Sequence, residues 1–130
     1  MAQKPVELIL ARQLASHLTM PIILLGAEGD LLFVNEPAEE MLGFRFDEVG
    51  ELPFSEWSDS FVVIGTDGER VSREDRPLLK ALTEQVPSHA DVVMRAMTGE
   101  HRSVSITAVP LVSQSGGYLG AIGLIWEPDQ

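Results

Sequence analysis

The clearest hydrophobic pattern in the chain lies in residues 31–44, LLFVNEPAEEMLGF. Its first four residues form a short apolar run with β-branched and aromatic side chains, which predicts a strand. Asn35 follows as a favoured helix N-cap, and Pro37 is compatible only with the first turn of a helix. Apolar residues then recur at helical spacing, and Gly43 suits the left-handed position that ends a helix. We therefore predict a strand, a cap, a two-turn helix and a stop.

An amphipathic helix is predicted near the N-terminus, over residues 5–18. Its apolar positions form two neighbouring stripes, one of which runs through Leu8 and Ala15. Together the stripes are too wide for a helix that is exposed on all sides, so the helix must cover its own domain, a second copy of the chain, or both. We expect a homodimer contact, whose candidate residues are Val6, Leu10, Leu14 and Leu18.

Five strands are predicted, at residues 22–25, 31–34, 91–95, 102–112 and 118–126. The first and the last are apolar on both faces, which predicts that both faces of the sheet are covered. Between the second and third strands, residues 73–82 favour a helix with Asp75 as its cap and Pro77 in its first turn. Shorter helical turns are expected over residues 45–57, and an apolar run follows at residues 61–64. This order predicts an α+β fold with a five-stranded antiparallel sheet and helices inserted after the second strand.

Several of these segments resemble PAS domains, the sensory modules of signalling proteins. VNEPAEEMLGF at residues 34–44 resembles the PAS signature VNxAAxxLLGY, and DRPLLKAL at residues 75–82 resembles a PAS helix that often faces the ligand pocket. The closing AVPLVSQSGGYLGAIGLIWE is similar to the last PAS hairpin. The resemblance covers almost everything after Thr19. It implies a PAS fold, with a flanking helix at residues 1–19 and a PAS domain at residues 20–130.

The composition narrows the possible classes of function. The chain has no cysteine, which excludes disulfides, thiolate metal sites and cysteine catalysis. Twenty acidic residues against nine basic ones give a net charge of −11, which repels phosphate backbones and anionic lipid headgroups. We therefore expect neither a nucleic-acid partner nor a membrane partner. The sequence shows no signal peptide and no apolar run of the roughly 18 residues that span a bilayer, so a cytoplasmic location is expected.

Much of the negative charge is concentrated in residues 36–59. Eight carboxylates lie in this segment against a single basic residue, Arg45. A solvated helical face is the interpretation that we favour for this run of charge. The alternative is an acidic docking surface for a basic partner.

No catalytic or metal-binding constellation is visible in the sequence. The three histidines, His17, His89 and His101, are scattered, and no nucleophile elbow, phosphate loop or paired-histidine motif is present. We therefore expect no enzymatic activity and no metal site.

The cofactors known in PAS domains can be compared with the residues present. The resemblance implies that a flavin of the LOV type needs a reactive cysteine, and the chain has none. It also implies that haem usually takes a histidine from the long helix, and residues 78–84 contain none. His89, just past that helix, is the residual haem ligand, although an ordinary strand-start histidine is the stronger interpretation. No cofactor is expected, and noncovalent flavin or haem is the open alternative.

The resemblance implies an apolar pocket between the sheet and the helix at residues 78–82. Its expected lining is Phe61, Leu78, Leu82, Val93, Ile106, Ile122 and Leu124. A filled core fits these residues as well as a ligand site does, because both are apolar. We expect a non-enzymatic sensory module that binds a small apolar molecule and signals, as a homodimer, to a protein partner or a fused output domain. The alternative is a ligand-free interaction module of a larger kinase, phosphatase or transcription regulator.

Overall fold

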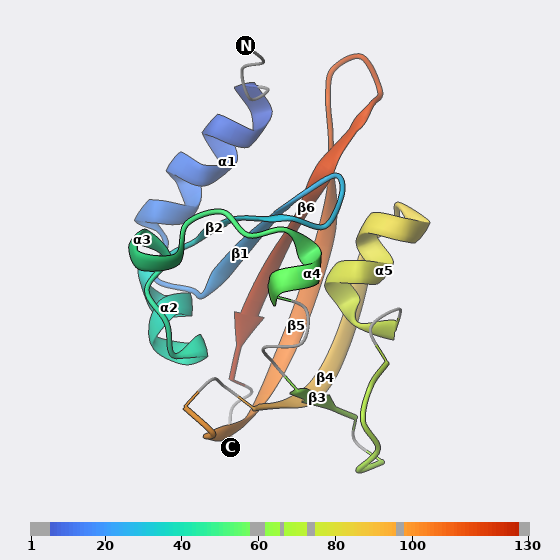
Figure 1. The fold of residues 1–130 in the computed structure, drawn as a ribbon. Helices are drawn as coiled ribbons and strands as arrows, with labels where there is room; N and C mark the ends of the chain where they lie inside the picture. The colour runs from blue at the N-terminus through green and yellow to red at the C-terminus, as the bar shows by residue number, and fades with distance from the viewer. Residues whose placement is uncertain (1–5, 58–61, 66, 73–74, 96–97, 128–130) are drawn as a thin grey trace.

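A computed structural model describes residues 6–57, 62–65, 67–72, 75–95 and 98–127 of the chain (Figure 1). The helices are α1 (Val6–His17), α2 (Glu36–Leu42), α3 (Phe46–Val49), α4 (Phe54–Trp57) and α5 (Pro77–Glu84). The strands are β1 (Ile22–Gly26), β2 (Leu31–Val34), β3 (Val62–Ile64), β4 (Ser88–Arg95), β5 (His101–Val112) and β6 (Tyr118–Trp126). All four helices from α2 to α5 follow the second strand and precede β4, as the sequence predicts.

The strands form one antiparallel sheet in the order β2-β1-β6-β5-β4-β3. This confirms the α+β class, but the sheet has six strands and not the predicted five. The added strand is β3, which pairs with the outer side of β4 and sets Val63 opposite Met94. Its sequence is visible as an apolar run, but a run of three strand residues carries no alternation from which a strand can be predicted.

The two faces of the sheet are covered by different helices (Figure 1). On one face, Ile23 joins a core that also contains Leu78 of α5 and residues of α2, α3 and α4. On the other face, Leu24 and Leu32 pack against Leu8 of α1. The predicted cover on both faces of β1 is therefore confirmed, and α1 supplies the second layer over this part of the sheet.

Asn35 joins α1, β1 and α2 through the four hydrogen bonds of its side-chain amide. Its Oδ1 accepts from the amide nitrogen of Ile22 at 2.9 Å and from that of Ala38 at 3.1 Å. Its Nδ2 donates to the carbonyl oxygens of Ala15 at 2.9 Å and Met20 at 2.8 Å. The predicted N-cap of α2 is thus confirmed, and the same side chain also holds the end of α1. Asn35 is only 1% exposed, and three of these bonds, those to Ile22, Ala38 and Ala15, are buried.

The start of α5 differs from the prediction. The helix begins at Pro77, with Arg76 in the N-cap position, whereas the sequence predicts that Asp75 caps it. Asp75 instead accepts a hydrogen bond from the hydroxyl of Ser72 at 2.9 Å. Because a guanidinium has no acceptor atom, the Arg76 side chain cannot cap the helix.

Candidate functional site

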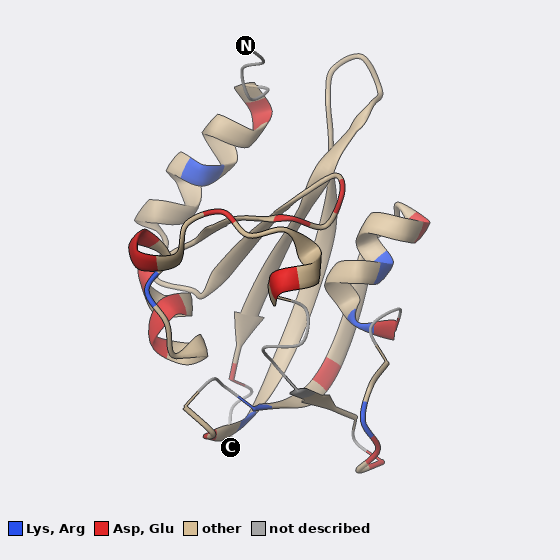
Figure 2. Cartoon of the chain, viewed as in Figure 1, with Lys and Arg blue, Asp and Glu red and all other residues tan. Residues whose placement is uncertain are grey.

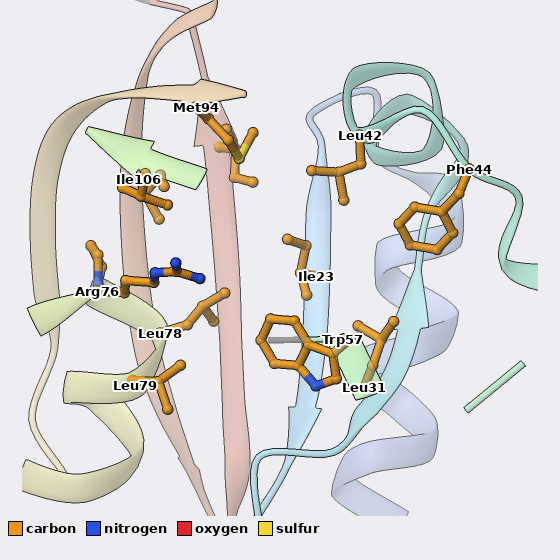
Figure 3. A pocket seen from close by; sticks show the side chains of 13 residues that line it. Ile23, Leu31, Leu42, Phe44, Trp57, Arg76, Leu78, Leu79, Met94 and Ile106 are labelled. Carbon is orange, nitrogen blue, oxygen red and sulfur yellow. The ribbon is translucent and has the colours of Figure 1, made fainter. Parts of the chain in front are cut away.

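A cavity of about 60 Å³ lies between α5 and the sheet (Figure 3). Its lining comes from the sheet, from α2 and the residues that follow it, from α4 and from the first turn of α5. The lining residues are Ile23, Leu31, Leu42, Phe44, Trp57, Val63, Arg76, Pro77, Leu78, Leu79, Met94, Ile106 and Ile125. A cavity of this size has room for a small molecule, because one water needs about 10–15 Å³ on this type of measure.

The wall formed by α4 is fixed by a hydrogen bond. The Trp57 indole Nε1 donates to the carbonyl oxygen of Gly29 at 2.9 Å, and the ring of Phe54 meets the indole edge to face at 5.6 Å. The only polar atom of the Trp57 side chain is therefore satisfied outside the cavity, so the indole presents an apolar surface to it.

The wall formed by α5 depends on Gly123 of β6. A Cβ atom at this position would lie 2.8 Å from Cδ2 of Leu78, which is too close for carbon atoms. The missing side chain thus allows Leu78 to pack directly on the strand. This close packing brings the first turn of α5 to the edge of the cavity.

Arg76 is the one charged residue among the described lining residues. Figure 3 shows its guanidinium extending from the start of α5 into the space that the lining side chains enclose. Its Nε is buried. The remaining lining side chains are apolar, apart from the Trp57 nitrogen that donates to Gly29. The site therefore combines one fixed cation with apolar walls.

The structure brings only part of the predicted lining together. Leu78 and Ile106 line the cavity, as predicted. Leu82 packs against the same core but is half-buried and lies outside the lining. Phe61 lies outside the described residues.

Three predicted lining residues, Val93, Ile122 and Leu124, are wrong for this cavity. Their neighbours Met94 and Ile125 line it instead, and side chains alternate between the two faces of a strand. Ile122 packs in the cluster beneath α1, on the other face of the sheet. The error arises because β6 is apolar on both faces, so its sequence does not indicate which face is turned toward α5.

The prediction also missed most of the wall opposite α5. The missed residues of this wall all lie between positions 23 and 57: Ile23, Leu31, Leu42, Phe44 and Trp57. Arg76 was missed as well, although an arginine immediately before a helix-starting proline is a visible signal. An arginine at the N-cap position cannot accept a hydrogen bond from the helix, but its side chain lies next to the first turn, which lines the cavity.

The candidate dimer residues lie on the outer side of α1, apart from Leu18, which follows the end of the helix. Val6, Leu10 and Leu14 are each close to 60% exposed, and Leu18 is 38% exposed. Leu8 on the opposite side of the helix is 6% exposed because it packs on the sheet. The structure thus separates the two apolar stripes: one covers the domain, and the other faces outward.

His89 lies on the face of β4 that is turned away from the cavity. Its Nδ1 is 2.8 Å from Oγ1 of Thr107 and its Nε2 is 3.4 Å from Oδ1 of Asp91, and its ring lies 5.7 Å from that of Trp126. Its neighbour Ala90 packs on the core that contains the cavity walls. The histidine is therefore not directed at the cavity. Among the described residues, no group of three acidic or histidine side chains is placed to hold a metal ion.

An ion pair joins the end of β6 to β5. The guanidinium of Arg102 donates to Glu127 at 2.6 Å and to Glu100 at 3.0 Å. The hydrogen bond to Glu127 raises the pKa of Arg102 above its ordinary value, with a smaller opposing effect from burial. Because an arginine is charged at any physiological pH, this shift has no consequence for pH dependence.

The acidic residues of this segment lie along α2, α3 and α4 and the stretches that join them (Figure 2). Glu36, Glu40 and Glu48 are exposed, while Asp59 lies outside the described residues. Glu39 has a structural role, since its Oε2 accepts from the backbone nitrogen of Phe46 at 2.6 Å. This bond replaces the missing cap at the start of α3, where Arg45 has no acceptor to offer. The exposed carboxylates agree with a solvated helical face.

Within the described ranges, no helix is both long enough and apolar enough to cross a membrane. A search among curated proteins found no match to the chain.

Three solved structures illustrate the similarity of the fold. The PAS domain of BvgS from Bordetella pertussis has a TM-score of 0.71 at 20% identity, with 97% of this chain and 89% of that chain covered. The PAS domain of nitrogen regulation protein NR(II) from Vibrio parahaemolyticus has a TM-score of 0.62 at 15% identity, with coverage of 92% and 98%. The PAS domain of the fruit-fly ELK potassium channel has a TM-score of 0.69 at 11% identity, with coverage of 98% and 100%.

A family model described as the PAS fold matches residues 15–130, which is most of the chain. PAS domains are in general sensory and signalling modules and are not catalytic. The order of the strands, the helices inserted before β4 and the family match lead to one conclusion. The chain belongs to the PAS family.

Proposed function

We propose that this PAS domain is a non-enzymatic sensory module that binds a small molecule between α5 and the sheet and signals, as a homodimer, to a protein partner or a fused output domain. The observation that carries the proposal is the cavity itself, which has apolar walls and one cation. Its walls are almost entirely apolar and enclose space that no described side chain fills, as the site of a small apolar ligand requires.

The volume of the cavity supports a small ligand. Pockets for drug-sized molecules measure about 300–1,000 Å³. The cavity, at about 60 Å³, is several-fold smaller, which supports a ligand smaller than flavin or haem. The net charge of −11 supports a protein or small-molecule partner and not a nucleic acid.

A ligand in this cavity can change the structure only by binding one arrangement of α5 better than another. α5 is short, and it is held on the sheet mainly by Leu78 and Ala81. The opposite wall includes Leu42 of α2, whose N-terminus is capped by Asn35. Since Asn35 also bonds to Ala15 at the end of α1, a continuous set of contacts joins the cavity to the proposed dimer helix.

The outer stripe of α1 supports dimerisation. Four of the ten large apolar side chains that are exposed in the described chain lie on α1, and two more, Leu18 and Met20, follow it directly. An exposed apolar group of this kind, concentrated on one helix, is typical of an interaction surface. The same observation favours the second candidate function, a ligand-free interaction module that uses only this surface.

Native mass spectrometry of the purified protein, with an absorbance spectrum of the same sample, tests the proposal. A dimer that carries a small adduct mass supports the sensory module. A dimer that stays free of adduct, and that shows no change in its amide NMR spectrum with any member of a small-molecule library, supports the ligand-free module instead. A flavin or haem absorbance band would contradict the small-ligand proposal.

Leu14→Glu tests the dimer surface. The substitution places a charge in the middle of the outer stripe, and burying it in an interface without a partner is costly. We expect the dissociation constant of the dimer to rise by at least about tenfold, which corresponds to roughly 1.4 kcal/mol. Light scattering across a concentration series measures this constant.

Ser16→Glu is the matched control for that experiment. Ser16 is exposed on the same helix but lies about 200° around it from Leu14, so it should leave the dimer intact. The dimer proposal fails if Leu14→Glu elutes at the same size as wild type, or if wild type is itself a monomer.

A further inference from the structure

We propose that the groove between α1 and β2 binds a medium-chain fatty acid, whose carboxylate meets the guanidinium of Arg12. The groove lies on the opposite face of the sheet from the cavity beside α5, so it is a second site and does not depend on the first. Its walls come from one side of α1 and from β1 and β2. Its volume is about 470 Å³, which is within the roughly 300–1,000 Å³ of typical small-molecule sites.

The first observation is how Arg12 is held in the wall of this groove. Its guanidinium carbon lies 4.7 Å from the centroid of the Phe33 ring and 5.8 Å from that of Phe46, and the two rings meet edge to face. In the part of the chain that the structure describes, no carboxylate is within ion-pair distance of Arg12, and its side chain makes no hydrogen bond. Because a guanidinium over a ring keeps the N–H donors at its edge, Arg12 has donors for the two oxygens of a carboxylate.

The charge of the whole chain opposes any anion, and this sets a limit on the ligand. The net charge is −11, but none of the described lining residues of the groove is acidic. At physiological ionic strength, exposed charges farther than about 8 Å are largely screened, so Arg12 is the charge that an anion in the groove meets at contact distance. An exposed ion pair alone contributes little, so an anion that has no apolar body should not bind measurably.

The second observation is the apolar end of the groove. Its base consists of three almost fully buried side chains, Leu8, Leu24 and Leu32. Beside them Ile9 is 45% exposed, and Phe33 is half-buried. Ile9 precedes Arg12 by about one helical turn, or roughly 5 Å along the axis of α1. An alkyl chain that runs from Arg12 toward Ile9 therefore lies over apolar surface, and each CH₂ group that it buries should raise the affinity by up to about fourfold.

The two ends of the groove together define the class of the ligand. Beyond Arg12 the lining continues with the exposed polar side chains of Gln13 and Ser16, so the groove changes from apolar to polar along α1. A molecule with one carboxylate and a single alkyl chain matches this order. A hydrocarbon would gain nothing from Arg12, and an anion that is polar on all sides would leave Ile9 uncovered.

The test compares octanoate with octanamide, which has nearly the same shape but no charge. Each is titrated into the purified protein and followed by amide NMR shifts of β1 and β2. We expect saturable binding of octanoate near the millimolar range, since a shallow groove gives so small a ligand few contacts. Octanamide should bind at least about threefold more weakly. Hexanoate should also bind more weakly because it buries fewer CH₂ groups, and acetate should not bind.

Three variants locate the site. Arg12→Met keeps an unbranched apolar stem, and we expect it to lower the affinity for octanoate at least about threefold, to the level of octanamide. Arg70→Met removes the same charge from an exposed residue outside the lining and should bind octanoate as wild type does. Gln13→Trp changes no charge but places a large ring at the groove, and it should block octanoate.

Each contrary outcome overturns a stated part of the proposal. Equal binding of octanoate and octanamide to wild type, or equal losses in Arg12→Met and Arg70→Met, would overturn the role of Arg12. Shifts around Leu78 and Ile106 in place of β1 and β2 would put octanoate in the cavity beside α5, which overturns the second site and supports the first. An absence of any shift overturns the second site alone. The comparison on wild type needs no variant, so it holds even if Arg12→Met does not fold.

Discussion

Asn35 and Arg76 occupy the same position, the N-cap, at the two helices α2 and α5, yet their surroundings are opposite. Asn35 is almost fully buried and uses both side-chain polar atoms in four hydrogen bonds to backbone groups. Arg76 has no acceptor for its helix, and its charge extends into a cavity with apolar walls.

The difference distinguishes a residue that holds the fold together, Asn35, from one that lines the candidate ligand site, Arg76. A buried polar group with every bond made fixes the positions of the elements that it joins, and any change to it leaves several backbone groups unpaired. Arg76 instead lies in the wall of the cavity, where a substitution would change the surface that a proposed ligand meets. The comparison predicts that substitutions near Asn35 act on stability, and that substitutions at Arg76 act on binding.

The largest effect is expected from Asn35→Ala. The substitution removes the hydrogen-bond partner of four backbone groups, those of Ile22, Ala38, Ala15 and Met20. Three of the four hydrogen bonds are fully buried. With a cost of about 1–3 kcal/mol for each buried group left without a partner, partly relieved by water, we expect a loss of about 4 kcal/mol in the free energy of unfolding. Urea denaturation measures this loss.

Gln13→Ala is the control, because it removes an exposed amide from α1 and should change stability by less than about 0.5 kcal/mol. A loss of under about 1 kcal/mol for Asn35→Ala would mean that water replaces the side chain, and the comparison with Arg76 would lose its basis.

An intermediate effect is expected from Leu78→Ala. Leu78 is 9% exposed and packs on Gly123, so truncation enlarges the cavity and should cost about 3 kcal/mol. Leu82→Ala, one turn further along the same helix, should cost about 1–2 kcal/mol because Leu82 is only half-buried. Equal losses in thermal or urea unfolding would show that α5 is not held mainly by its first turn.

The smallest effect on stability is expected from Arg76→Met. Methionine keeps much of the apolar stem, and removing a desolvated guanidinium offsets the contacts that are lost. We expect unfolding within about 1 kcal/mol of wild type under urea. A loss as large as that of Asn35→Ala would instead make Arg76 a structural residue, and the two N-cap positions would not differ in the way that we expect.

The sequence predicts the architecture near Asn35 well, because local chemistry determines it. The cap at Asn35 and the left-handed Gly43 at the end of α2 both occur as predicted. Both features depend on backbone groups that lie within a few residues of one another in the chain, and sequence patterns are informative over that distance.

The cavity could be predicted only in outline, because its walls come from distant segments. The position of the helix against the sheet is correct, and two of its expected lining residues are in place. The inward face of β6 could not be deduced, since β6 is apolar on both faces. In β4 the polar His89 and Asp91 mark the outward face, so the choice of Val93, which lies on that face, could have been avoided. Trp57 and Arg76 line the same cavity only because of how α4 and α5 are set against the sheet, and no local signal in the sequence carries that information.

The order of strands also has a consequence for the time the chain needs to fold. β1 lies beside β6, and Ile22 is paired with Leu124 across roughly a hundred residues of chain. Closing so long a loop costs roughly 2–3 kcal/mol more in entropy than closing the short turn between β5 and β6. At about 5–20 residues per second, β6 follows β1 out of a ribosome by roughly 5–20 s. Throughout that interval the apolar Ile22–Gly26 segment has no partner on its β6 side, so this strand, which is interior in the finished sheet, is exposed to aggregation during synthesis.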